Sequence, residues 1–119
     1  MIEISGVRIK KDGKTLLLHR KKWDHWELPG GTVEPTESPR KTAIRETKEE
    51  IGVDVEILRE LDTVDFEIGG KNVRSYQYIA KIISGEPKLM EPDIHDDIGF
   101  FDLETQESLA PNITLAGLN

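Results

Sequence analysis

The chain has 119 residues, which is enough for one domain with a single hydrophobic core. Its composition, 36% hydrophobic and 33% charged, is typical of a folded domain and not of a disordered chain. A net charge of −7 argues against binding to DNA or RNA, and the lack of cysteine excludes disulfides and thiolate chemistry.

The first part of the chain predicts a β-hairpin followed by a short strand. Residues 2–9 alternate between polar and apolar side chains, as a half-buried strand does. Residues 11–14 contain an Asp-Gly turn signal, so residues 15–21 are expected to return as the second strand. Residues 26–28 predict a short strand that runs into a turn at residues 29–31.

Residues 38–51 predict a helix. Ser38 is a good N-cap, Pro39 suits the first helical position because its missing N–H costs nothing there, and Gly52 suits the C-terminal cap. The side chains expected to face the core are Ile44, Thr47 and Ile51. A separate stripe beside them carries Glu46, Glu49 and Glu50.

The second part of the chain predicts further strands and a final short helix. Strands are expected within residues 53–66, as one strand or two, and at residues 73–83 and 99–103. A turn at residues 69–72 and a long polar connection at residues 84–98 separate them, and a helix is expected at residues 111–118. This order predicts an α/β (α+β) domain over residues 1–119, an α/β/α sandwich around a central mixed β-sheet.

The acidic stripe has a physical requirement of its own. Residues three and four apart on a helix share a face, so Glu46, Glu49 and Glu50 point the same way. Three neighbouring carboxylates repel one another unless a cation lies between them. Hard cations such as Mg²⁺ take oxygen ligands, and the stripe is therefore a candidate metal site.

The spacing around this stripe resembles the Nudix box. Gly31 is followed after five residues by Glu37, after seven more by Arg45-Glu46, after two by Glu49-Glu50 and after one by Gly52-Val53. Residues 26–30, WELPG, also resemble the usual lead-in of the Nudix family. The one departure is Thr47, where the family usually has an aliphatic residue, and we expect it to affect packing and not catalysis.

The resemblance implies an Mg²⁺-dependent hydrolase, with Mn²⁺ as a possible substitute, that cleaves a nucleoside diphosphate linked to another group. Glu46, Glu49, Glu50 and the backbone carbonyl of Gly30 match the metal ligands of the family. Glu37 and Arg45 match an ion pair that braces the helix.

The catalytic base of the family varies in position. Glu91 lies at the spacing of a MutT-type loop glutamate and is a candidate base or metal ligand, with Glu49 or Glu50 as the competing base. Asp96 and Asp97 are weaker candidates, and His95 is interpreted as a loop residue.

Substrate contacts are expected outside the box. Arg20 and Lys21, at the end of the second strand, could reach phosphates, although Lys21 stands where MutT-like proteins carry an arginine. Asn112 resembles a MutT-type asparagine that reads a purine edge, but it could equally be a helix N-cap. The aromatic residues that could stack on a base, or simply pack, are Trp23, Trp26 and Phe66.

These features favour a MutT-like member that converts a nucleoside triphosphate to the monophosphate and pyrophosphate, with an oxidised purine nucleotide as one candidate substrate. The alternatives are ADP-ribose, a nucleotide sugar or a dinucleoside polyphosphate as substrate, or a non-catalytic nucleotide-binding module. The expected partner is a small nucleotide and not a nucleic-acid polymer, and a homodimer is possible. No apolar run approaches the ~20 residues of a membrane helix, so no membrane association and a cytoplasmic location are expected.

Overall fold

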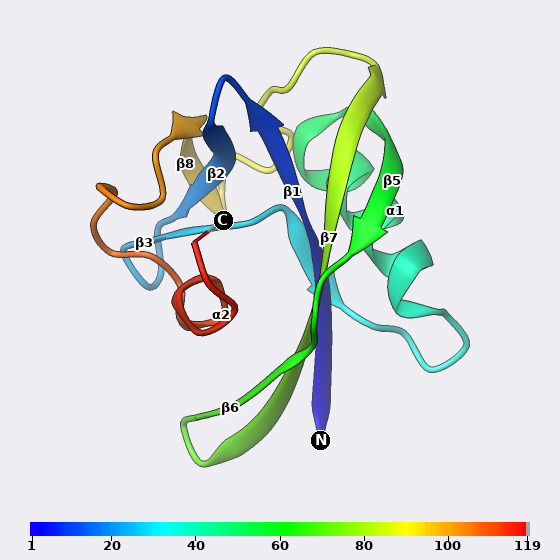
Figure 1. Ribbon diagram of the computed structural model, residues 1–119, viewed down its shortest axis with the longest axis vertical. Coiled ribbons are helices and arrows are strands. Elements are labelled where there is room, and N and C mark those ends of the chain that lie inside the picture. The colour runs from blue at the N-terminus through cyan, green and yellow to red at the C-terminus, as the bar shows by residue number, and fades with distance from the viewer. Residues whose placement is uncertain (119) are drawn as a thin grey trace.

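The computed structural model describes residues 1–118, so Asn119, the last residue of the predicted domain, lies outside the described residues. A mixed eight-stranded sheet lies between two helices in this part of the chain (Figure 1). The elements are β1 (Ile2–Lys11), β2 (Lys14–Arg20), β3 (His25–Glu27), β4 (Gly30–Thr32), α1 (Pro39–Ile51), β5 (Asp54–Glu60), β6 (Val64–Ile68), β7 (Lys71–Ser84), β8 (His95–Phe101) and α2 (Pro111–Leu115).

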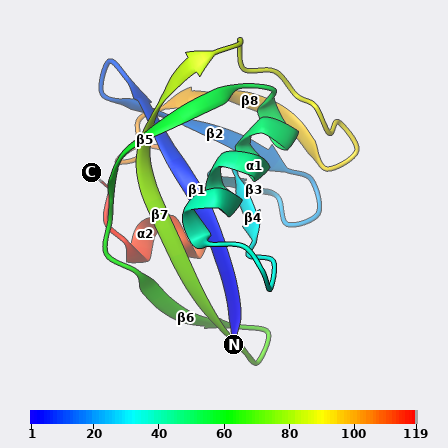
Figure 2. The same ribbon diagram turned by 90° about the vertical axis from the view of Figure 1, so that its right-hand side faces the viewer.

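The sheet is held together by a parallel pairing between its two long strands. β1 and β7 run side by side with Ile2 opposite Val73 and Ile9 opposite Ala80, and the path through the sheet is β3-β2-β1-β7-β5. The other strand pairs along this path are antiparallel, and so are the three that lie off it, in which β4 adds to β1, β6 to β7 and β8 to β2. The helices α1 and α2 lie on opposite sides of β1 and β7 (Figure 2). The predicted sandwich around a mixed sheet is confirmed.

The local signals for the hairpin and the helix are confirmed as well. Asp12 and Gly13 both have positive φ, as a two-residue hairpin turn between β1 and β2 requires. Ser38 caps α1 by accepting a hydrogen bond from the backbone N–H of Lys41, and Gly52 ends the helix with a φ of 75°. These features depend on residues close together in sequence, which explains why the sequence sufficed to predict them.

One prediction about the buried face of α1 is wrong. Ile44 is 37% exposed, whereas the helix buries Thr42, Ala43, Thr47, Glu50 and Ile51. The buried face is therefore rotated toward the acidic stripe, and Glu50 belongs to both. The Thr47 hydroxyl donates to the Ala43 carbonyl at 2.7 Å, so this polar side chain is satisfied within the helix.

Three boundaries also differ from the sequence-based prediction. The turn expected at residues 29–31 overlaps β4, because residues 30–32 pair with β1. β8 begins at His95 and not at residue 99, because Arg20 at the end of β2 pairs with it, which shortens the connection to residues 85–94. α2 ends at Leu115. Each difference involves a partner that is distant in sequence or a frayed end, which local patterns do not reveal.

Two apolar clusters fill the layers on either side of the sheet. The larger cluster lies under α1 and includes Val7, Leu16, Ile51, Val53 and Ala80. The smaller cluster lies under α2, and its buried members are Leu17, Leu28, Leu103, Ala110 and Ile113. Because α2 has only five residues, this second cluster and its polar contacts must hold it in place.

Two glycines allow β4 to approach β1 closely. Gly6 pairs with Gly30, and a Cβ atom added to Gly30 would lie 2.4 Å from the Ser5 carbonyl oxygen. A Cβ atom added to Gly6 would lie 2.6 Å from the Pro29 carbonyl oxygen. In both cases the obstacle is backbone, which cannot move aside as a flexible side chain can.

We expect the substitution Gly6→Ala to lower the free energy of unfolding by about 1–3 kcal/mol, because backbone must shift to admit the methyl group. Urea denaturation measures this loss. Gly99→Ala is the matched control, since its added Cβ would meet only the Phe101 ring at 3.1 Å. Equal losses in the two variants would contradict the close approach as the cause.

Candidate functional site

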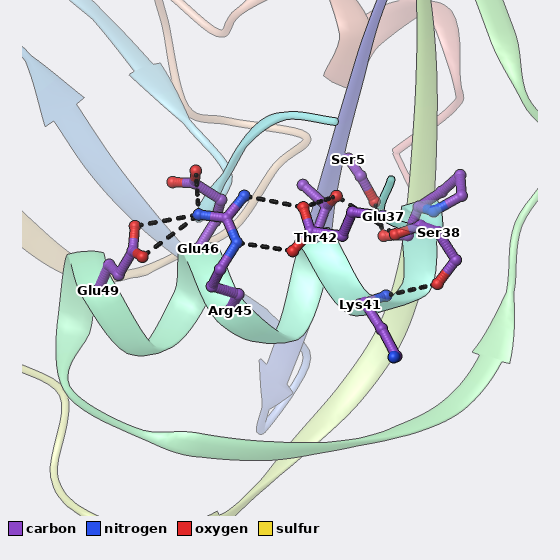
Figure 3. A network of polar contacts seen from close by, with 9 residues as sticks. Ser5, Glu37, Ser38, Lys41, Thr42, Arg45, Glu46 and Glu49 are labelled. Atoms are coloured by element: carbon purple, nitrogen blue, oxygen red, sulfur yellow. Dashed lines mark hydrogen bonds and ion pairs between the residues drawn. The ribbon is translucent and has the colours of Figure 1, made fainter. Parts of the chain in front are cut away.

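The first turns of α1 are braced by an ion pair. The Arg45 Nε donates to Glu37 Oε2 at 2.7 Å and Arg45 Nη2 donates to Glu37 Oε1 at 2.9 Å. The Thr42 hydroxyl donates to the same carboxylate at 2.6 Å (Figure 3). Hydrogen bonds from Arg45 and Thr42 lower the pKa of Glu37 to about 2. Glu37 is thus held as a carboxylate that ties the loop before α1 to the middle of the helix.

The same arginine reaches the acidic stripe. Arg45 Nη1 lies 3.0 Å from Glu46 Oε1 and 3.2 Å from Glu49 Oε1, so one guanidinium contacts three carboxylates (Figure 3). Hydrogen bonding to Glu37, followed by that to Glu49 and Glu46, raises the pKa of Arg45 above its ordinary value despite the opposing effect of burial. Arg45 therefore offsets part of the repulsion within the stripe.

Glu46 lies against the glycine strand β4. A Cβ atom on Gly31 would come within 2.4 Å of the Glu46 carboxyl carbon, so the lack of a side chain at Gly31 makes room for this carboxylate. Burial raises the pKa of Glu46, and the negative charges of Glu49 and Glu91 add to the rise. Glu91 is half-buried in the connection before β8, and its electrostatic effect on Glu46 indicates that its charge lies near the stripe.

Glu50 is the most buried acid of the stripe, with 4% of the residue exposed. Its Oε1 accepts a hydrogen bond of 2.7 Å from the backbone N–H of Gly30. Burial raises the pKa of Glu50 to about 8, and the nearby charges of Glu27 and Glu46 also raise it. A buried carboxylate beside two others favours a cation more strongly than an exposed one does.

A second polar group lies beside Glu50 and centres on Glu27 of β3. The Arg20 Nε donates to both Glu27 oxygens at 2.9 Å, and the Nε2 atoms of His25 and His95 lie 2.8 and 3.0 Å from the same carboxylate. Burial alone would raise the pKa of Glu27, but hydrogen bonds from His25, His95 and Arg20 lower it well below 4.5. Glu27 is therefore charged and fully engaged.

The two groups meet in a cluster that could hold a metal ion. Glu27, Glu50 and His95 each offer one ligand atom, and these atoms lie within 4.8 Å of one another. The sequence-based interpretation missed Glu27 and treated His95 as a loop residue. His95 is instead fully buried as the first residue of β8. The position of Glu27 was the available signal, because it is a charged residue between two apolar ones, Trp26 and Leu28, shortly before the glycine turn.

The other candidate acids of the last connection are engaged elsewhere. Asp96 Oδ1 lies 2.6 Å from His19 Nδ1, and Asp97 accepts a hydrogen bond from the backbone N–H of Ile98. The connection itself docks on the end of α1, because the N–H of Met90 donates to the Glu50 carbonyl at 3.1 Å. This contact carries Glu91, the next residue, toward the acidic stripe.

A pocket of about 380 Å³ runs from this charged region across the strands of the sheet. Its lining residues on the β2 and β3 side of β1 include the charged Arg20 and Glu27, with Gly30 and Gly31 of β4. On the β6 and β7 side it is lined by Asn112 and by the apolar Phe66, Ile68 and Val73, and its other apolar members include Ile4 and Leu28. One end of the pocket is therefore suited to charge and the other to a flat apolar group.

Of the remaining residues that were predicted to contact the substrate, some line the pocket and others do not. Trp23 lines the pocket, and its ring lies 5.0 Å below the Arg20 guanidinium carbon. Trp26 packs against Phe101 in the smaller apolar cluster, with ring centroids 4.4 Å apart. Lys21 is exposed and is not among the residues that line the pocket.

The donor set suits a hard divalent cation. The stripe and the neighbouring cluster supply carboxylate oxygens and one imidazole nitrogen, and Mg²⁺ and Mn²⁺ both accept carboxylates. The buried carboxylate of Glu50 lies beside Glu27 and Glu46. Among residues 1–118, no cationic side chain lies within hydrogen-bond distance of it, and His95 Nε2 is 3.8 Å away. The residues present therefore fit the metal that the acidic spacing predicts.

The model of the NUDIX domain family matches residues 2–113. The chain belongs to this family. The predicted resemblance to MutT-like members is also confirmed, by a solved structure and by curated relatives. A crystal structure of a MutT NUDIX hydrolase from Burkholderia pseudomallei is 33% identical, with a TM-score of 0.90, and the match covers 97% of this chain and 94% of that one.

Two curated relatives of this NUDIX chain have names that state a substrate. The CTP pyrophosphohydrolase of Escherichia coli is 33% identical over 66% of this chain and 61% of the relative. The 8-oxo-dGTP diphosphatase of Proteus vulgaris is 34% identical over 58% of this chain and 65% of the relative. The chain thus spans less than two thirds of either curated relative. No helix among residues 1–118 is long and apolar enough to cross a membrane.

We expect Glu37→Gln to destabilise the NUDIX fold in a pH-dependent manner. The pKa of Glu37 is about 2 in the folded chain against an ordinary 4.5, so its stabilising effect is complete above pH 4.5 and is lost as the pH falls toward 2. Urea denaturation between pH 6 and pH 3 should show a stability gap between the wild type and the variant that narrows as the pH falls. Glu60→Gln, on the exposed end of β5, is the control, and a gap independent of pH would contradict the assignment.

Proposed function

We propose that this protein is a Mg²⁺-dependent nucleotide pyrophosphohydrolase that converts a nucleoside triphosphate to the monophosphate and pyrophosphate. An oxidised purine nucleotide is one candidate within this class. The observation that carries the proposal is the two-ended pocket. Its charged end includes Gly30 and Gly31, which lie against Glu50 and Glu46 of the acidic stripe, and its apolar end contains Phe66 and Asn112. A polyphosphate chain attached to a base has the same division of charge.

Glu46, Glu49 and Glu50, with the carbonyl of Gly30, would hold the cation, and Glu91 is a further candidate ligand. When bound, the cation would neutralise charge on the phosphate oxygens and lower the pKa of a water molecule. Glu37 and Arg45 act indirectly, because their ion pair fixes the helix that carries the ligands. Arg20, held by Glu27 through its Nε, keeps its two terminal nitrogens for phosphate oxygens at the charged end.

The reaction needs a base that takes a proton from the attacking water. The water oxygen forms a bond to phosphorus, the bridging phosphorus–oxygen bond breaks, and the water proton passes to a carboxylate. Glu49, 52% exposed in its side chain, Glu50 and Glu91 are the candidates for this carboxylate. Glu91 gains support from the docking of its segment on α1, which brings its charge near Glu46 and Arg20.

The names of the two curated relatives, which act on CTP and on 8-oxo-dGTP, support a nucleoside triphosphate as the substrate. A panel of ordinary and oxidised nucleoside triphosphates, ADP-ribose, a nucleotide sugar and a dinucleoside tetraphosphate tests this choice. Mg²⁺-dependent release of pyrophosphate from a triphosphate is the expected result, and product identification separates the other classes. Binding without turnover on every member would instead indicate a non-catalytic module.

We expect Glu49→Gln and Glu50→Gln each to lower kcat by about 10²–10⁴-fold, because each removes a carboxylate that holds the cation or accepts the proton. Pyrophosphate release at saturating Mg²⁺ measures the loss, and circular dichroism checks the fold. Glu60→Gln, which removes an exposed acid at the end of β5 and outside the helix that carries the stripe, should keep normal turnover. Near-normal turnover in both stripe variants would overturn the assignment of the metal ligands.

We expect Asn112→Ala to raise KM for the preferred nucleotide by up to about tenfold while kcat stays within about threefold. One hydrogen bond to a base contributes about 0.5–1.5 kcal/mol, and a factor of ten corresponds to about 1.4 kcal/mol. Steady-state kinetics separates the two constants. A fall in kcat without a change in KM would place Asn112 outside base recognition.

A further inference from the structure

Arg8 is wholly buried in β1, on the side of the sheet covered by α2. Its Nε donates to the side-chain oxygen of Gln77 at 2.9 Å, and its Nη2 donates to the Ile113 carbonyl of α2 at 3.3 Å. Burial lowers the pKa of Arg8, which reflects the cost of removing a guanidinium from water. Such a group lies in a core only where hydrogen bonds compensate for that cost, and here one bond goes to β7 and one to the short helix α2.

The chemistry of Arg8 fixes the orientation of Gln77. An arginine side chain has only donors, so the Gln77 atom that faces it must be the amide oxygen. The Gln77 nitrogen then faces the other way, where it donates to the Asn112 carbonyl at 2.8 Å and toward the Ser75 hydroxyl at 3.4 Å. Exchanging the two Gln77 atoms would place donor against donor at Arg8 and acceptor against acceptor at Asn112.

This chain of hydrogen bonds continues into the pocket. The side-chain nitrogen of Asn112 donates to the Ser75 hydroxyl at 3.3 Å, and both residues line the pocket. The side-chain oxygen of Asn112 accepts no hydrogen bond from any residue between 1 and 118. Asn112 therefore offers the pocket an acceptor, while its nitrogen and its backbone carbonyl are both tied to β7.

The helix that carries Asn112 is short. α2 spans five residues, and no side chain caps its N-terminus. The N–H of its N-cap residue Ala110 donates to the Trp26 carbonyl of β3 at 2.8 Å, and Ala110 and Ile113 are both buried in the smaller cluster. Beyond this start, its polar links to the sheet include the hydrogen bonds to the carbonyls of residues 112 and 113 and the side-chain bond at Ser75. The polar links set the direction of the Asn112 side chain, which apolar packing alone does not.

We infer that Arg8 and Gln77 are positioning residues for base recognition, which hold Asn112 so that its side-chain oxygen selects a base carrying an N–H donor. The ligand class is a nucleotide whose base presents an amino group or a ring N–H to that oxygen. The inference rests on the proposed function, since it assigns a role at the same pocket. Neither residue touches the substrate, and both act through Asn112.

Gln77→Glu isolates this role. The carboxylate keeps the size of the side chain and still accepts from Arg8, but it places an oxygen against the Asn112 carbonyl where Gln77 has a donor. We expect KM for the preferred nucleoside triphosphate to rise about tenfold, with kcat within about threefold. The KM for ribose 5′-triphosphate, which has no base, should be unchanged. Gln106→Glu, the same substitution in the loop after β8, is the matched control and should match the wild type.

A double variant and a milder one complete the test. Gln77→Glu combined with Asn112→Ala should be no worse than Asn112→Ala alone, because both changes remove the same contact. If Gln77→Glu does not fold, Ser75→Ala serves instead, since it frees the Asn112 side chain but keeps both carbonyl bonds, and it should raise KM for the nucleotide alone.

The outcomes separate the two proposals. An unchanged KM for the nucleotide in a folded Gln77→Glu variant would overturn the positioning role and leave the proposed function intact. An equal rise in KM for ribose 5′-triphosphate would also overturn it, because a general distortion of the site does not distinguish the base. Absence of turnover by the wild type on every nucleotide would overturn both proposals.

Discussion

The hydrogen bond from the backbone N–H of Gly30 to the buried carboxylate of Glu50 joins the glycine strand β4 to helix α1, and the arrangement of the site depends on it. It forms only because β4 approaches β1 at the distance that Gly6 and Gly30 permit. The same approach leaves room at Gly31 for Glu46. A packing constraint between two strands thus determines where two carboxylates of the helix lie.

Charge in the site is divided between two arrangements that serve different purposes. Glu27 and Glu37 are each surrounded by donors, which lower the pKa of both and hold them as structural anions. Burial and neighbouring carboxylates raise the pKa of Glu46 and Glu50. Glu27 and Glu37 are thus stabilised as anions by the protein itself, whereas the charged forms of Glu46 and Glu50 would gain more from a bound cation. Glu27 also belongs to the cluster with Glu50 and His95, so it connects the two arrangements.

The two faces of the sheet carry the two helices that bear the candidate site residues. α1 covers one face and carries the acidic stripe, while α2 covers the other and carries the pocket residue Asn112 (Figures 1 and 2). Each helix packs on its own apolar cluster. The short α2 is held in addition by hydrogen bonds from inside the sheet, which Arg8 and Gln77 donate to the carbonyls of Ile113 and Asn112.

The hairpin at Asp12-Gly13, the caps of α1 at Ser38 and Gly52, and the spacing of the acidic stripe could all be predicted from the sequence, because they depend on residues within a few positions of one another. The exposure of Ile44, the burial of His95 beside Glu27 and the position of Arg8 beneath α2 became visible only in the folded chain. They depend on the parallel pairing of β1 with β7 and on the antiparallel pairing of β2 with β8. Both pairings join strands far apart in the chain, which no local pattern of side chains reveals.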